Sequence, residues 1–221
     1  MHSFRNQNKD KKLIVGVGSA LSDILAHEDE VFLSKAGAVK GGMTYVNKEF
    51  IDETLLLSSQ SPALVPGGSA CNTVVGVGKL GGAARFVGKC GTGAMGEFFE
   101  NDLKRQNVEP ALLRSDSPTG RVLSIITPDA QRSMFTFLGA SAETKPQDIA
   151  QKFFTNAAIV HIEGYLLFNP ELILKVLKTA KKSGARVSLD LASFNVVKES
   201  HEQLQHIVES YVDILIANED E

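Results

Sequence analysis

The stretch AAIVHIEGYLLFNPELILKVLKTAKKSGARVSLDLA, residues 157–192, decides the fold class. Its first and last segments, AAIVHIEG and ARVSLDLA, are short apolar runs that predict buried strands. Between them, Asn169 and Pro170 are typical first residues of a helix, which we expect to end before Gly184. A helix over residues 202–211 and a strand over residues 212–218, VDILIAN, continue the alternation. Strands joined by single helices imply right-handed crossovers, so the sequence predicts an α/β fold with a parallel sheet between helices.

The N-terminal half contains two kinds of segment. LIVGVG, residues 13–18, predicts a buried strand that leads through a turn to Asp23. Residues 120–138 differ, because polar and apolar residues partly alternate on both sides of the turn PDAQ, as in a hairpin with one solvent-exposed face. We therefore expect an additional small sheet. Further expected elements are strands within residues 42–46 and 84–89, and helices over residues 69–80, 96–107 and 146–154.

Length and charge exclude several classes of protein. A chain of 221 residues with a formal net charge of −3 has the composition of one ordinary globular domain. Its only basic cluster, Lys9 to Lys12, lies in a polar opening, residues 1–12, that we expect to be a flexible arm. Nucleic-acid binding is therefore not expected, and no apolar stretch approaches the length of a membrane span. Cys71 and Cys90 form no CxxC pair, which favours buried thiols in a cytoplasmic protein.

Three predicted strands end in polar residues. Glu163, Asp190 and Asn218 follow the strands of residues 157–163, 185–190 and 212–217, respectively. In a parallel sheet these ends lie at one edge, where open α/β folds bind ligands. Any one of them could simply begin a loop, but three in succession favour a shared cleft.

Two glycine patterns resemble nucleotide-binding fingerprints. GVGKLG, residues 76–81, lies at the end of a predicted helix, whereas the fingerprint must begin one. GTGAMG, residues 91–96, lies between a predicted strand and a helix, and Asp116 follows about 20 residues later, as a ribose-binding acid would. A dinucleotide-dependent oxidoreductase therefore stays open as an alternative. Against it, Asp116 lies in RSDSPTG, a turn-like stretch with no predicted strand to present it.

A different set of residues suggests a site for a polyol. Gly67 and Gly68 lack side chains, so a ligand can approach their backbone, and they lead into a helix whose first amides are free donors. Asn72, one turn into that helix, offers a donor and an acceptor, and Asp23 can accept hydrogen bonds from two neighbouring hydroxyls. If these four residues converge, they form a site for a sugar ring.

The same residues carry a family resemblance. Residues 67–108, GGSACNTVVGVGKLGGAARFVGKCGTGAMGEFFENDLKRQNV, resemble the first signature of the PfkB-type family of carbohydrate and nucleoside kinases, which includes ribokinase and adenosine kinase. The final YVDILIANEDE resembles the strand that leads into the family's N-x-x-E motif, here Asn218 to Glu221. The resemblance implies a ribokinase-like three-layer α/β core over residues 13–221, with a β-sheet lid whose strands come from residues 31–47 and 118–138.

The resemblance also implies roles for residues. Asp23, Gly67, Gly68 and Asn72 would bind the hydroxyls of a sugar or nucleoside, and Glu163 would be an acid aimed at the substrate. The cofactors would be ATP and Mg²⁺, with Asn218 and Glu221 ordering the water shell of the ion and the phosphates without binding the metal directly. Some relatives form homodimers through their lid sheets and others are monomers, so a lid-to-lid homodimer stays open.

The sequence departs from the family in one motif. It contains no G-A-G-D, the segment that supplies the catalytic aspartate and the amides that receive developing charge. We therefore expect the domain to be C-terminally truncated, with its catalytic residues downstream of Glu221. The expected activity is phosphoryl transfer from ATP to a hydroxymethyl group, with negligible turnover by this chain alone. A non-catalytic sugar- or nucleoside-binding fragment is the second alternative.

The nature of the acceptor is the last expectation. GYLLFNPE, residues 164–171, and YVDILIANEDE, residues 211–221, resemble the nucleoside kinase branch, whereas Glu163 resembles the sugar kinases. We favour adenosine or a related nucleoside. Phe135 and Phe137 are candidates for contacting its base and equally for the core of the hairpin. Arg132 at the hairpin turn could reach a phosphate, but we favour a solvated turn residue.

Overall fold

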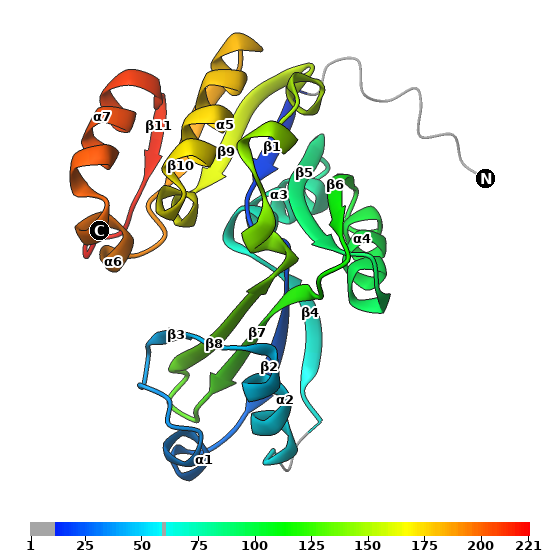
Figure 1. Cartoon of the computed structure of the whole chain (residues 1–221), viewed down its shortest axis with the longest axis vertical. Coiled ribbons are helices and arrows are strands. Elements are labelled where there is room, and N and C mark those ends of the chain that lie inside the picture. Colours follow the sequence, from blue (N-terminus) through cyan, green and yellow to red (C-terminus); the bar gives the residue numbers. More distant parts are fainter. Residues whose placement is uncertain (1–11, 59–60) are drawn as a thin grey trace.

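The computed structural model describes residues 12–58 and 61–221 (Figure 1). The predicted arm of residues 1–12 therefore lies, apart from Lys12, outside the described residues. The described chain forms a six-stranded parallel sheet in the order β11-β10-β9-β1-β5-β6, the core sheet, and a five-stranded mixed sheet in the order β3-β8-β7-β2-β4, the lid sheet. The core strands are β1 (Leu13–Val17), β5 (Ala84–Gly91), β6 (Val108–Ser115), β9 (Ala157–Glu163), β10 (Arg186–Asp190) and β11 (Ile214–Ile216).

Helices cover both faces of the core sheet. Strand alternation directs Val15 and Val17 to the face packed by α5 (Pro170–Lys182) and α7 (His201–Tyr211). The opposite face packs against α3 (Ser69–Lys79) and α4 (Ala94–Arg105), whose buried residues include Val74 and Phe99. On that face α3 comes so close to β1 that a Cβ on Gly16 would lie 2.7 Å from Val74 Cγ1. The predicted three-layer α/β fold with a small β-sheet lid is confirmed.

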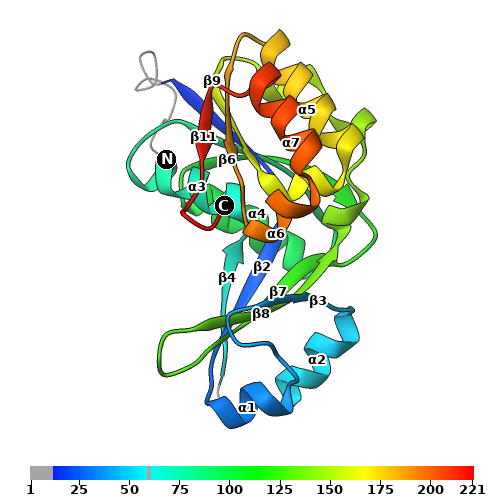
Figure 2. The ribbon, with the colours of Figure 1, turned by 90° about the vertical axis from the view of Figure 1, so that its left-hand side faces the viewer.

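The lid sheet also has two different faces. Its strands are β2 (Leu21–His27), β3 (Met43–Tyr45), β4 (Ala63–Gly67), β7 (Thr119–Ile126) and β8 (Arg132–Gly139). Ile24, Leu123 and Phe135 lie side by side across β2, β7 and β8 and pack under α1 (Glu30–Lys35) and α2 (Lys48–Leu56). The other face is directed toward the core, and Figure 2 shows the lid as a separate layer below the core helices.

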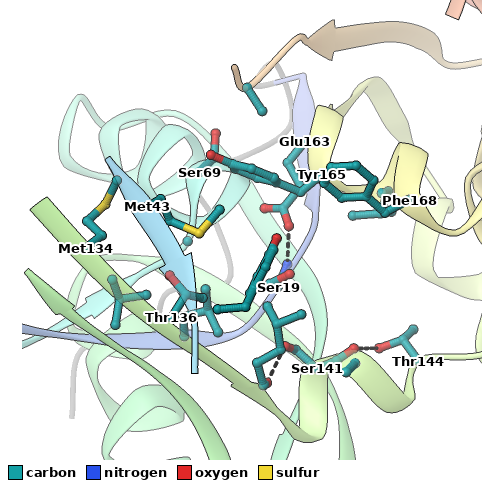
Figure 3. A pocket seen from close by; sticks show the side chains of 18 of the residues that line it. Ser19, Met43, Ser69, Met134, Thr136, Ser141, Thr144, Glu163, Tyr165 and Phe168 are labelled. Carbon is teal, nitrogen blue, oxygen red and sulfur yellow. Dashed lines mark hydrogen bonds between the residues drawn. The ribbon is translucent and has the colours of Figure 1, made fainter. Parts of the chain in front are cut away.

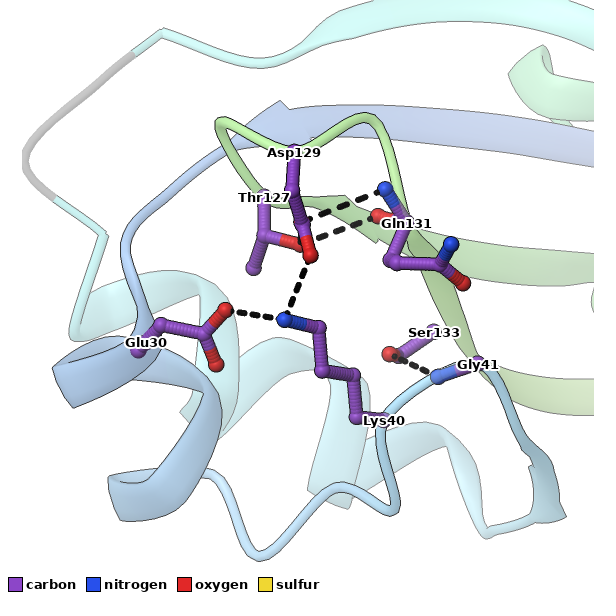
Figure 4. Close-up of polar contacts among 7 residues, drawn as sticks. All are labelled: Glu30, Lys40, Gly41, Thr127, Asp129, Gln131 and Ser133. Atoms are coloured by element: carbon purple, nitrogen blue, oxygen red, sulfur yellow. Dashed lines mark hydrogen bonds and ion pairs between the residues drawn. The ribbon is translucent and has the colours of Figure 1, made fainter.

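Polar contacts fasten the far end of the lid. The ammonium of Lys40, just before β3, pairs with the carboxylates of Glu30 on α1 and Asp129 in the β7–β8 turn, the latter at 2.6 Å (Figure 4). The amide of Gly41 donates to Ser133 Oγ on β8 at 2.9 Å. These contacts hold the loop before β3 against the hairpin, and so fix β3 at the edge of the lid sheet.

Local structure differs from the sequence expectations at several places, and α1, α2 and β4 are elements that the sequence did not predict. Asp23 lies inside β2 and not in a turn after the first strand. The helix expected from Pro146 to Phe154 is two 3-10 turns, η2 (Pro146–Asp148) and η3 (Gln151–Phe154), because Ile149 between them is extended and buried in the core. Strand β6 was not predicted. It lies at the edge of the core sheet and is partly exposed, so its sequence contains no continuous apolar run that would indicate a buried strand. No helix within the described ranges is long and apolar enough to span a bilayer.

Candidate functional site

A cavity lies between the lid sheet and the carboxyl edge of the core sheet. Its volume is about 510 Å³. Its walls come from the inner face of the lid, the start of α3, the end of β9 and the following turn η4 (Gly164–Phe168). Figure 3 shows Met43, Met134 and Thr136 of the lid opposite Glu163, Tyr165 and Phe168 of the core. Asp23, Gly68, Asn72 and Glu163 line this one cavity.

Asp23 provides a buried carboxylate in the lid wall. It pairs in register with Val122, which pairs with Thr136, which pairs with Tyr45, so a row across four strands faces the cavity. Asp23 is only 6% exposed, and none of the described residues donates a hydrogen bond to its carboxylate. Burial raises its pKa, partly opposed by Arg132, whose Nη2 lies 3.9 Å from Oδ2. Asp23 lines the cavity, so a ligand hydroxyl there could donate a hydrogen bond to its carboxylate.

The glycine pair allows the chain to pass close to Asp23. A Cβ on Gly67 would lie 2.2 Å from Asp23 Oδ1. Gly68 has φ +98°, and a Cβ there would lie 2.3 Å from the carbonyl oxygen of Ser19. Both positions therefore require glycine. Gly68 caps α3, and its carbonyl accepts the amide of Asn72, whose side chain is exposed to the cavity.

Two carboxylates at neighbouring strand ends hold the start of α3. Glu163 on β9 and Asp190 on β10 are register partners. Glu163 Oε1 accepts the Ser19 amide at 2.8 Å and Oε2 the Ala70 amide at 3.4 Å, while Asp190 Oδ2 accepts Ser69 Oγ at 2.7 Å. Burial raises the pKa of Glu163 to about 7, and the hydrogen bonds from Ser19 and Ala70 partly oppose that rise. Ser19 and Ser69 were not predicted as site residues, since no local sequence signal distinguishes either serine.

Asn218 and Glu221 do not join this cavity. They follow β11, at the same edge of the core sheet as Glu163 but two strands away. The side chains bond to each other, with Asn218 Nδ2 donating to Glu221 Oε1 at 3.1 Å, and Asn218 is exposed. Among residues 12–58 and 61–221 no group of three or more His, Cys, Asp or Glu side chains could bind a metal ion. These two residues thus form a hydrogen-bonded pair apart from the cavity.

Apolar side chains complete the cavity wall. Arg132, Met134 and Leu138 alternate along β8 toward the cavity, so Arg132 lines the site and is not merely a solvated turn residue. Phe135 and Phe137 have the opposite parity and pack with the lid helices, Phe135 edge-on to Phe50 at 4.8 Å between ring centroids. Period-two alternation was the signal that could have separated the two sets.

Three amides of GTGAMG donate hydrogen bonds within the protein. The Gly91 amide donates to Thr119 Oγ1 at 3.0 Å, the Thr92 amide to the Ser115 carbonyl at 3.0 Å, and the Gly96 amide to the Gly93 carbonyl at 2.9 Å. Strand β6 does present Asp116, so the sequence argument against a dinucleotide site was wrong in that respect. None of residues 91–96 lines the cavity between lid and core.

Comparisons with known proteins agree with this architecture. Residues 42–221 match the family model of the pfkB family carbohydrate kinases. "Probable fructokinase-2" of Arabidopsis thaliana is 25% identical over 194 residues, covering 84% of this chain and 52% of the relative. The adenosine kinase of Sinorhizobium meliloti superposes with a TM-score of 0.85 at 30% identity, and a probable sugar kinase of Rhizobium etli CFN 42 with 0.86 at 29%. Each superposition covers 95% of this chain and 65% of the other.

The chain thus spans about half the length of this curated fructokinase relative. The family match covers most of the described lid and core, including the glycine pair, Asn72, Glu163 and the final N-x-x-E residues. The chain belongs to the pfkB family of carbohydrate kinases.

Proposed function

We propose that this chain provides the acceptor-binding part of a kinase that transfers phosphate from ATP to a hydroxymethyl group of a sugar or nucleoside. One observation carries the proposal: the buried carboxylate of Asp23 faces a cavity of about 510 Å³ without a hydrogen-bond donor, beside Gly68 and Asn72. Neighbouring hydroxyls of a ribose or hexose are the donors that such a carboxylate and amide would bind. Gly67 allows the approach, and Glu163 closes the cavity on the core side.

We propose a nucleoside, adenosine or a relative, as the acceptor class. Asp23 and Asn72 supply polar groups, whereas Met43, Met134 and Phe168 supply apolar ones from both walls of the same cavity. A nucleoside presents both kinds of surface, a polyol and a flat apolar base, and sulfur and aromatic side chains pack well against aromatic rings. A free hexose has no flat aromatic surface that could pack against these apolar side chains.

ATP and Mg²⁺ belong to the same proposal. Asn218 is exposed and Glu221 partly exposed at the carboxyl edge of the core sheet, the edge that also carries Glu163. Amide and carboxylate oxygens suit the water shell of Mg²⁺, which usually keeps several of its waters. When bound, the ion would neutralise charge on the transferred phosphate, while the lid would exclude water from the acceptor.

Calorimetry tests the acceptor site directly. We expect adenosine to bind more tightly than ribose or fructose, and Asn72→Ala to weaken its binding about tenfold through the loss of a hydrogen-bonding amide, ~1.4 kcal/mol. Asn101→Ala is the matched control, because Asn101 is an exposed helix residue on α4 outside the cavity. Equal affinities of the two variants for adenosine would contradict the site.

A coupled ADP-release assay tests the second part. The sequence holds no G-A-G-D, so we expect the 221-residue chain to bind adenosine with negligible turnover. Turnover comparable to that of a complete kinase would overturn this expectation. The chain should also leave NADH fluorescence unchanged, and an enhancement abolished by a Gly93 substitution would favour the oxidoreductase.

A further inference from the structure

The chain crosses between core and lid four times, at residues 18–20, 68, 116–118 and 140–156. Each of the first two crossings leads to residues of the proposed acceptor site. Ser19 precedes Asp23 by four residues, and Gly68 is followed at once by the helix that carries Asn72. The relative position of these two crossings therefore sets the distance between the lid carboxylate and the core amide.

A single side chain contacts both crossings. Glu163 accepts the Ser19 amide with Oε1 at 2.8 Å and the Ala70 amide with Oε2 at 3.4 Å. It is 1% exposed, and a Cβ on Gly18 would lie 2.1 Å from Oε2, so the first crossing passes directly over the carboxylate. Ser69 Oγ adds a third bond, to Asp190, the register partner of Glu163.

We propose that Glu163 is a positioning residue that ties the β1–β2 crossing to the start of α3, and thereby holds Asp23 and Asn72 at the spacing an acceptor requires. This role goes beyond that of a substrate-contacting acid, because it acts in the ligand-free protein through backbone amides. The effect of Glu163 on acceptor affinity rests on the proposed function. The link that Glu163 makes between the Ser19 and Ala70 amides, called the tie below, does not.

The ionisation state of Glu163 should control the tie. The carboxylate accepts both amides, whereas protonation weakens one oxygen as an acceptor. Burial places its pKa at about 7, and the titratable groups that interact with it are Asp190 on β10, Tyr165 on η4, Tyr45 on β3 and Cys71 on α3. The charge of Asp190 contributes to this raised pKa, after burial. The ionised form should therefore dominate above pH 7 and be lost below it.

Amide NMR of the ligand-free chain tests the tie. In the wild type we expect the ¹H shifts of the Ser19 and Ala70 amides to titrate together with a midpoint near pH 7, as Glu163 does. In Glu163→Gln this titration should be absent, and the amide that then faces the side-chain NH2 group should exchange faster by about tenfold. Glu109→Gln is the matched control, since Glu109 is an exposed carboxylate on β6 paired with Arg85.

A second variant guards against a folding defect. Glu163→Asp keeps the charge but shortens the side chain, so we expect at most one of the two amides to titrate. Ser19 and Ala70 amides that show no common titration in the wild type, or that titrate equally in Glu163→Gln, would overturn the proposal whether or not adenosine binds.

Acceptor binding is the final readout. If only the ionised form is competent, the apparent Kd for adenosine should rise about tenfold from pH 8 to pH 6 in the wild type. Glu163→Gln should bind adenosine more weakly at pH 8 and show no such dependence. A dependence that persists unchanged in this variant would assign it to another group, such as Asp23, and contradict the link between the tie and affinity.

Discussion

At the scale of single residues, the site depends on close approaches that only small residues allow. Gly67 lies against the carboxylate of Asp23, Gly68 lies against the Ser19 carbonyl, and Gly18 lies against Glu163. In each case a Cβ would come within 2.1 to 2.3 Å of an oxygen atom. Such contacts keep polar groups of lid and core near one another without intervening side chains, and so leave the cavity free for a ligand.

Gly67→Ala tests this arrangement. Its Cβ would overlap Asp23 Oδ1, at 2.2 Å, so the carboxylate must turn away from its present position. We expect adenosine affinity to fall by about tenfold or more, ~1.4 kcal/mol, by calorimetry. Gly93→Ala is the control, because a Cβ there meets no atom within 4 Å. Wild-type affinity in Gly67→Ala would show that Asp23 does not bind the acceptor.

At the scale of elements, α5 shows how local signals and packing agree. Asn169 Oδ1 accepts the Leu172 amide at 3.2 Å, and Pro170 occupies the first turn, as the sequence predicts. One face of the helix, including Ile173, Val176 and Leu177, is fully buried against the core sheet. The apolar periodicity and the N-terminal cap therefore specify the same helix. Its packing supports β9 and β10, whose ends carry Glu163 and Asp190.

Leu177→Ala tests the contribution of this packing. Leu177 is 0% exposed, so its truncation removes buried apolar surface and leaves a cavity. We expect the free energy of unfolding in urea to fall by about 2–5 kcal/mol. Leu80→Ala is the matched control, since Leu80 is 90% exposed at the end of α3 and should change stability by less than about 0.5 kcal/mol. Similar losses in both variants would contradict the assigned core.

At the scale of the whole molecule, the lid and the core share the cavity between them. The lid has its own apolar cluster under α1 and α2, and the core has two clusters, one on each face of its sheet. A ligand that contacts Asp23 on one side and Asn72 on the other would join the two sheets. Its binding should therefore stabilise the native chain as a unit.

A thermal shift measures this coupling. With adenosine at about 100 times its Kd, the native state should gain about 2.7 kcal/mol. For a chain of this size that corresponds to a rise in Tm of roughly 5–10 °C. Asp23→Asn should show no comparable shift at the same concentration, because it loses the charged acceptor. An equal shift in that variant would place adenosine elsewhere.

Prediction from sequence succeeded where the signal is local. Apolar runs, the caps at Asn169 and Pro170, and the alternation of strand and helix identified the α/β core, because each depends on residues a few positions apart. The same logic failed at β6 and at Ile149, where position in the sheet, and not local pattern, determines the backbone.

The sequence by itself determined the fold class, the glycine pair and the set of polar residues at strand ends. Only the tertiary structure decided which of them meet. It places Asp23 in the lid beside Gly67 and ties Glu163 to Ser19 and Ala70, and it leaves Asn218 outside the cavity. The physical reason is that these contacts join residues up to 144 positions apart, through strand order and register that no local pattern encodes.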